Sequence, residues 1–162
     1  MTLKKSTADR FENVQGRVAV VVADFHDGIS KGLLDGVEKI FEQYEGVQWQ
    51  VHRVPGAFEI PLMAQKLSSV VEVKDDDREE RIFDVIIALG CVLSGKTYHF
   101  ELVSNECSRG CMDVMLQQDI PVVFEVLACY SLKDAKKRSS GKSNAGTLAA
   151  HAALDWLQKL KA

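Results

Sequence analysis

The sequence lacks a long apolar run, an excess of basic residues and closely paired cysteines. No apolar run approaches the roughly 20 residues needed to cross a bilayer, and residues 1–11 are too polar for a secretory signal. We therefore expect a cytoplasmic protein that does not bind membranes. The formal net charge is -3, with acids and bases interspersed, which argues against nucleic acid as a partner.

Cysteine is also scarce, and none of the four cysteines falls in a CxxC pair. Cys107 and Cys111 stand one helical turn apart, but without nearby histidines this spacing is only a weak indication of zinc. We expect reduced structural thiols, including Cys91 and Cys129, and no metal site. At 162 residues the chain is long enough to bury a core without disulfide support, which suits a single domain.

Apolar segments that read as buried strands alternate with segments of helical periodicity. Strands are predicted over 17–23, 48–54, 83–89 and 121–127, and a last helix is predicted to run to Lys161. This alternation predicts an α/β protein, a three-layer α/β/α sandwich with a four-stranded parallel sheet of flavodoxin-like type. We expect residues 1–16 to be an N-terminal extension and residues 17–162 to form a single domain.

The segment 72–81 is almost wholly charged, so it cannot bury apolar area. We expect a solvated loop insertion within the domain at about these residues.

The segment 90–100 brings together glycines, a hydroxyl, a cation and an imidazole directly after the third predicted strand. Ligands in open α/β sheets bind outside the carboxyl ends of the strands, so we expect an active-site loop here. His99 could move protons near neutral pH, or it could be a surface or N-cap histidine; its position alone leaves both readings open.

Other strand ends carry further candidates. Phe25 and Phe58 could stack on a planar ligand, although filling the core is the more usual role for such residues. Arg138, with lysines around it, could bind a phosphate, although a charge run is more often a solvated face. Taken together, these loops suit a cleft for an aromatic, phosphorylated or hydroxylated small molecule.

Three segments carry motifs of a known family: Val54–Pro61, Leu89–Phe100 and Pro121–Leu127. In sequence and spacing they resemble the lumazine synthase family, and the resemblance extends over about residues 17–160. The resemblance implies a cofactor-free condensation of 5-amino-6-(D-ribitylamino)uracil with 3,4-dihydroxy-2-butanone 4-phosphate. The products would be 6,7-dimethyl-8-ribityllumazine, inorganic phosphate and water, in the penultimate step of riboflavin biosynthesis.

The resemblance also assigns roles in binding the pyrimidine substrate. Phe25 would stack on the pyrimidine ring, and Glu59 would accept hydrogen bonds from the ribityl hydroxyls. The residues that would hold the ribityl chain or meet the pyrimidine edge through the backbone are Ala57, Phe58, Glu59, Cys91, Val92 and Leu93.

At the phosphate end, the resemblance implies that Lys96, Thr97 and Arg138 bind the butanone phosphate, while His99 shuttles protons. Family sites lie between subunits of a homopentamer, so Phe124 and Arg138 would come from the adjacent chain. Riboflavin synthase is a candidate partner.

The chain also departs from the family pattern. His26 stands where asparagine is usual, and Ser94 stands where arginine is frequent, so we expect Lys96 to supply part of that charge. Ala145 replaces a lysine in an altered turn after Arg138, and we expect a free pentamer or decamer rather than a sixty-subunit shell.

Two other functions compete with the synthase. A flavin- or lumazine-binding paralogue without turnover would fit the loss at Ala145, but not the retention of His99 and Arg138. A receiver-type signalling domain would need clustered acids after the first strand, where Asp24 is isolated.

Overall fold

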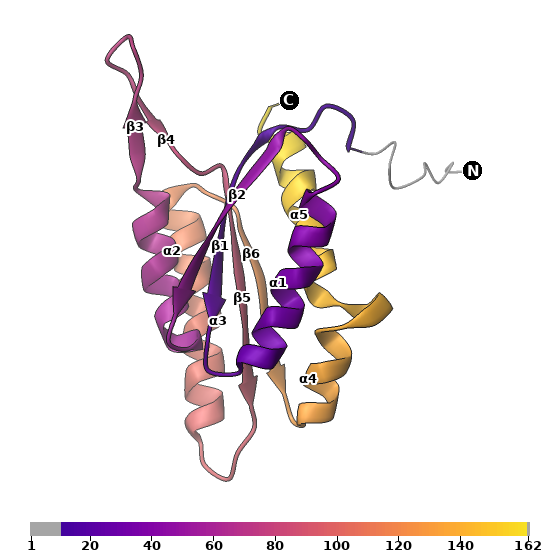
Figure 1. Cartoon of the computed structure of the whole chain (residues 1–162). Coiled ribbons are helices and arrows are strands. Elements are labelled where there is room, and N and C mark those ends of the chain that lie inside the picture. The colour runs from indigo at the N-terminus through magenta and orange to yellow at the C-terminus, as the bar shows by residue number, and fades with distance from the viewer. Residues whose placement is uncertain (1–10, 162) are drawn as a thin grey trace, which may run out of the picture.

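A four-stranded parallel sheet forms the centre of the molecule in the computed structural model, which describes residues 11–161 (Figure 1). The strands lie in the order β2-β1-β5-β6. Their bounds are β1 Gly16–Ala23, β2 Val47–Val54, β5 Val85–Leu93 and β6 Val122–Cys129. β1 and β5 are apolar and almost fully buried, as central strands covered on both faces should be.

Helices cover both faces of this sheet. On one face, α1 Asp27–Phe41 packs beside α5 Ala145–Lys159, and on the other α2 Ile60–Ser68 packs beside α3 His99–Gln118 (Figure 1). A shorter helix, α4 Leu132–Arg138, lies against β6. The predicted α/β/α sandwich with a four-stranded parallel sheet is therefore confirmed.

Alternate residues of β1 supply the two halves of the core. Val18, Val20 and Val22 belong to the cluster with α1 and α5, whereas Ala19 and Val21 belong to the cluster with α2 and α3. This alternation follows from the two-residue period of a strand. Both faces are apolar, so the sheet must be covered twice.

The N-terminal part of the predicted extension, residues 1–10, lies outside the described residues. Phe11 and Val14 are described, and both side chains are buried in the core cluster beside α1 and α5. None of the helices within residues 11–161 combines the length and hydropathy of a membrane span.

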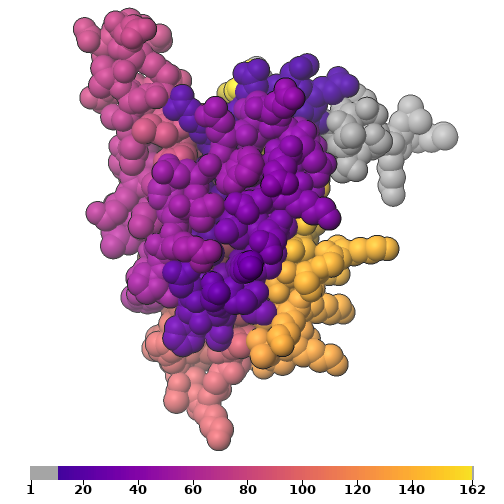
Figure 2. Space-filling view, in the orientation of Figure 1, coloured from indigo at the N-terminus to yellow at the C-terminus, as the bar shows by residue number. Residues whose placement is uncertain are grey.

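The predicted solvated loop insertion at about 72–81 contains two short strands, because these residues contribute to a hairpin. β3 Val71–Val73 pairs antiparallel with β4 Glu79–Arg81, and the hairpin projects from the body of the molecule (Figures 1 and 2). Lys74 forms ion pairs with Glu72 and with Glu80 on the opposite strand, and Glu72 also pairs with Arg17 of β1. Charged side chains thus support the pairing without burial, and most remain exposed as expected.

The third predicted strand also ends later than expected. The hydrogen-bonded register of β5 with β6 continues from Gly90, opposite Val126, to Leu93, opposite Cys129. Cys91, Val92 and Leu93 therefore lie in the strand, and the connection to α3 is only Ser94–Tyr98. A short buried run cannot reveal where pairing with a neighbouring strand stops.

Candidate active site

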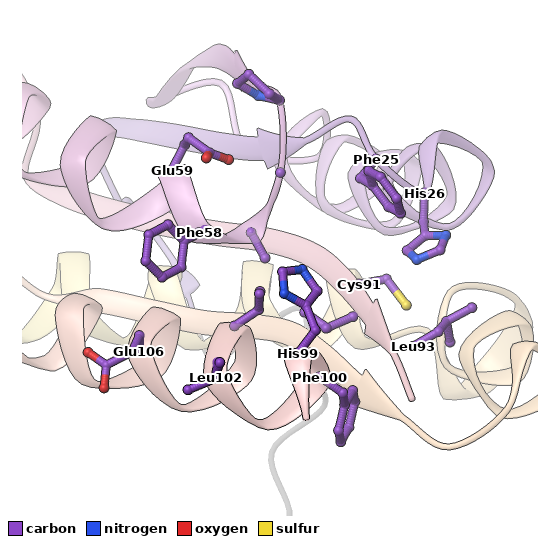
Figure 3. Close-up of a pocket in the computed structure, with 15 residues that line it drawn as sticks. Phe25, His26, Phe58, Glu59, Cys91, Leu93, His99, Phe100, Leu102 and Glu106 are labelled. Carbon is purple, nitrogen blue, oxygen red and sulfur yellow. The ribbon is translucent and has the colours of Figure 1, made fainter. Parts of the chain in front are cut away.

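A cavity of about 640 Å³ opens beyond the carboxyl ends of the central strands (Figure 3). Parallel strands end at the same edge of the sheet, so connections that are distant in sequence meet there. Three segments line the cavity: residues after β1, the turn after β2, and the end of β5 with the first turns of α3. The predicted site residues among them are Phe25, Ala57, Phe58, Glu59, Cys91, Val92, Leu93 and His99.

Phe25 and Phe58 are rings of the cavity wall, not core residues. The Phe25 side chain is 80% exposed and that of Phe58 is 59% exposed. Phe25 follows the end of β1, and Phe58 lies in the 3-10 turn Ala57–Glu59 before α2, so neither reaches between sheet and helix. The expectation that such residues fill the core is wrong here, and both rings are free to meet a planar ligand.

His99 is the first residue of α3, and its exposed ring lies in the middle of the cavity (Figure 3). Phe58 lies on one side of it, and Phe25 and His26 lie on the other (Figure 3). Tyr98 occupies the N-cap position, so the alternative in which His99 caps the helix is not realised. The imidazole is placed to exchange protons with a molecule bound between these rings.

Glu59 brings a carboxylate to the rim of the cavity. It occupies the N-cap position of α2 but makes no side-chain cap hydrogen bond, so its oxygens remain available. Pro61 stands in the first turn of α2, where the missing N–H of proline leaves no helical hydrogen bond unmade. The carboxylate can therefore accept hydrogen bonds from hydroxyl groups of a ligand.

Cys91 lines the cavity, but it is not suited to be a nucleophile. Its side chain is only 4% exposed, and burial raises the pKa of its thiol to about 12, helped by the neighbouring Cys129. A neutral thiol attacks poorly. Cys91 and its neighbours can thus contribute shape and backbone groups to recognition.

Four residues predicted for the site do not line this cavity. Lys96 and Thr97 lie on the exposed Ser94–Tyr98 connection at the end of the molecule (Figure 1). Phe124 is on the edge strand β6, and Arg138 is the last residue of α4. The cavity of one chain therefore contains the predicted pyrimidine-binding groups without the predicted phosphate-binding groups.

Sequence reasoning missed several residues of the wall, namely His26, Pro55, Gly56, Phe100, Leu102, Val103 and Glu106. Leu102, Val103 and Glu106 follow His99 at helical spacing, so the start of α3 could have placed them on one side. Glu106 accepts hydrogen bonds from Arg109, at 2.9 Å to Nε and 2.6 Å to Nη2.

His26 packs edge-on against Phe25, with ring centroids 5.0 Å apart and planes at 88°. Nearby, Asp24 pairs with Arg53 of β2, with Oδ1 and Nη1 2.6 Å apart. Asp24 and Arg53 lie at adjacent strand ends because β1 and β2 run in register. This ion pair joins the residue that follows β1 to the neighbouring strand β2.

The cysteines give no metal centre among residues 11–161, where no group of three or more potential ligands is assembled. Cys107 and Cys111 lie on the buried face of α3, and both are free thiols. A hydrogen bond with Cys111, together with burial, raises the pKa of Cys107. The pair packs as part of the core.

The fold and the cavity define an α/β protein with a cavity beyond the strand ends that is lined by aromatic rings, imidazoles and carboxylates. A family model described as 6,7-dimethyl-8-ribityllumazine synthase matches residues 15–161. The chain belongs to this family.

Curated relatives agree with the match. The chain is 37% identical over 145 residues to the 6,7-dimethyl-8-ribityllumazine synthase of Thermococcus kodakarensis, covering 90% of this chain and 86% of that protein. It is 38% identical over 144 residues to that of Thermococcus onnurineus, covering 89% and 88%. It is 38% identical over 130 residues to that of Pyrococcus furiosus, covering 80% and 76%.

Proposed function

We propose that the cavity around His99 is the pyrimidine half of the active site of a lumazine synthase. As a member of the family, the chain is a transferase of riboflavin biosynthesis. It condenses 5-amino-6-(D-ribitylamino)uracil with 3,4-dihydroxy-2-butanone 4-phosphate. The observation that carries the assignment of the site is His99 in one cavity with the exposed rings of Phe25 and Phe58.

Binding of the pyrimidine follows from the chemistry of the wall. Phe25 stacks on the heterocycle, and Glu59 accepts hydrogen bonds from the ribityl hydroxyls beside Ala57 and Phe58. Backbone groups at the end of β5, from Cys91 to Leu93, meet the pyrimidine edge. Both new bonds of the lumazine ring form between the two substrates, and the family resemblance implies that no cofactor takes part.

His99 moves protons during the condensation. The amine attacks the ketone and water leaves as the imine forms; phosphate is then eliminated, and ring closure releases a second water. Each step transfers a proton, which an imidazole near neutral pH can accept and return. Holding the two reactants in contact supplies much of the remaining acceleration.

A neighbouring subunit completes the site. Phe124 and Arg138 lie outside the cavity of their own chain, and Phe124 is 37% exposed on the unpaired edge of β6. In a homopentamer each chain gives these two residues to the next cavity. Arg138 then binds the phosphate through its fork of N–H donors, with Lys96 and Thr97 from the β5–α3 connection.

The test is to incubate the purified wild-type chain with both substrates and to follow the fluorescence of the lumazine product. We expect product above the uncatalysed rate, and weaker activity in His99→Ala and Arg138→Ala. An assembled wild-type oligomer that gave no acceleration would contradict the synthase assignment and favour a non-catalytic flavin- or lumazine-binding paralogue.

A further inference from the structure

Glu125 is an acidic residue in an apolar row of β6. Val123 and Cys129 pack against the core cluster of α1 and α5, and Leu127 belongs to that cluster. Glu125 alternates in step with these residues, so its side chain points to the same face of the sheet. A half-buried carboxylate in such a row costs desolvation free energy, and neither the fold nor the proposed chemistry so far uses it.

Arg138 lies close enough to this row to act on it. α4 packs on β6, its Ala135 belongs to the same core cluster of α1 and α5, and the helix ends at Arg138. Burial raises the pKa of Glu125, and the positive charge of Arg138 partly offsets that effect. Burial and the negative charge of Asp134 raise the pKa of Cys129, and the positive charge of Arg138 lowers it. α4 therefore lies on the face of the sheet to which Glu125 points, and the charge of Arg138 acts on both Glu125 and Cys129.

Arg138 and Glu125 interact electrostatically at a distance. Within the described part of the chain, no hydrogen bond or ion pair joins Arg138 to Glu125, and the Arg138 side chain is exposed. The N–H donors of Arg138 are thus free to bind a phosphate while the carboxylate lowers the positive potential around them.

We propose that Glu125 weakens the hold of Arg138 on phosphate and so sets the affinity of the site for phosphorylated substrate and for released phosphate. This inference rests on the proposed function, which assigns Arg138 to the phosphate. A dianion that approaches the guanidinium is attracted by one charge and repelled by the other. The reaction must bind a phosphate ester and then release inorganic phosphate, so a moderated affinity favours turnover.

The experiment compares wild type with Glu125→Gln, which removes the charge and nearly preserves the shape. We expect the inhibition constant for inorganic phosphate and the KM for the butanone phosphate to fall about threefold to tenfold at low ionic strength. The difference should shrink at about 0.5 M salt, where charges are screened. The KM for the pyrimidine should not change.

Matched variants separate charge from structure. Glu125→Asp keeps the charge and should resemble wild type, while Glu125→Thr gives a second neutral side chain that suits a strand. Glu79→Gln in the hairpin makes the same change in net charge far from Arg138 and should have no effect. In an Arg138→Ala background, Glu125→Gln should no longer alter phosphate binding.

Calorimetric titration with inorganic phosphate tests the inference without relying on turnover. An unchanged phosphate affinity in Glu125→Gln, an equal change in Glu79→Gln, or a change that persists without Arg138 would overturn it. Wild type that does not bind phosphate would overturn it as well. If phosphate affinity changes as expected while wild type makes no lumazine, the proposed function fails and the electrostatic role of Glu125 stands.

Discussion

Two exposed aromatic rings and the imidazoles of His99 and His26 determine, at the residue scale, what the cavity can hold. Phe25 and Phe58 offer apolar faces that water solvates poorly, and His99, the proposed proton carrier, lies between them. Cys91 adds no nucleophile, because burial raises its pKa to about 12. The cavity therefore suits a planar ligand whose reaction requires proton transfer without covalent attachment to the protein.

Replacing His99 with alanine should slow the reaction and leave measurable activity. General acid–base catalysis contributes about a hundredfold or more, whereas orientation of two bound reactants survives the change. We expect kcat to fall about a hundredfold with a small change in either KM, as measured by steady-state kinetics of lumazine formation. Unchanged kcat would exclude His99 as the proton shuttle.

Lys96 is expected to supply part of the charge that Ser94 lacks. Lys96→Ala should raise the KM for the butanone phosphate about fivefold, because one charge-assisted contact with the phosphate is lost. Lys39→Ala, on the last turn of α1, serves as the matched control. The hypothesis is refuted by an unchanged KM for the phosphate substrate in Lys96→Ala.

At the scale of elements, the ends of strands and helices place the site. Hydrophobic periodicity was sufficient to predict the four strands, because β1, β5 and β6 are largely apolar runs and β2 alternates apolar and polar residues. It could not predict that pairing with β6 carries β5 on to Leu93, since that limit depends on the neighbouring strand. Likewise, the cross-strand ion pairs of the hairpin are not visible in its composition.

The start of α5 is fixed by Asn144, which is only 8% exposed. Its Oδ1 accepts a hydrogen bond from the Gly146 N–H at 2.8 Å, and its Nδ2 donates to the carbonyls of Gly32 and Ser139 at 2.8 and 3.2 Å. The side chain thus caps α5 and ties it to α1 and to the residue after Arg138. These hydrogen bonds hold the segment between α4 and α5 against α1.

Asn144→Ala should therefore destabilise the protein more than the loss of an ordinary helix cap does. We expect a loss of about 2 to 3 kcal/mol in the free energy of unfolding, because buried carbonyl groups also lose their donor. Ser131→Ala removes the cap of α4, where the Ser131 hydroxyl accepts from the Asp134 N–H, and should cost about 1 kcal/mol. Urea denaturation of both variants makes the comparison, and equal losses would contradict it.

At the scale of the whole molecule, one chain provides only part of the proposed site. The residues predicted for the pyrimidine converge on one cavity, whereas Phe124 and Arg138 lie outside it. Positions after strand ends, which a parallel sheet brings together, predict a cleft with Phe25, Phe58 and His99, and the family resemblance implies that this cleft holds the pyrimidine. Composition and periodicity do not place Phe124 and Arg138 in a neighbouring cavity; that assignment rests on the family resemblance and requires an interface between chains.

Subunit complementation tests this shared site most directly. His99→Ala and Arg138→Ala subunits are each purified, unfolded together in equal amounts and refolded into mixed oligomers, and lumazine formation is compared with each variant refolded alone. A shared site predicts that some cavities regain both His99 and Arg138, so the mixture should exceed the average of the two separate variants. Activity equal to that average, in oligomers shown to be mixed, would contradict a site built from two subunits.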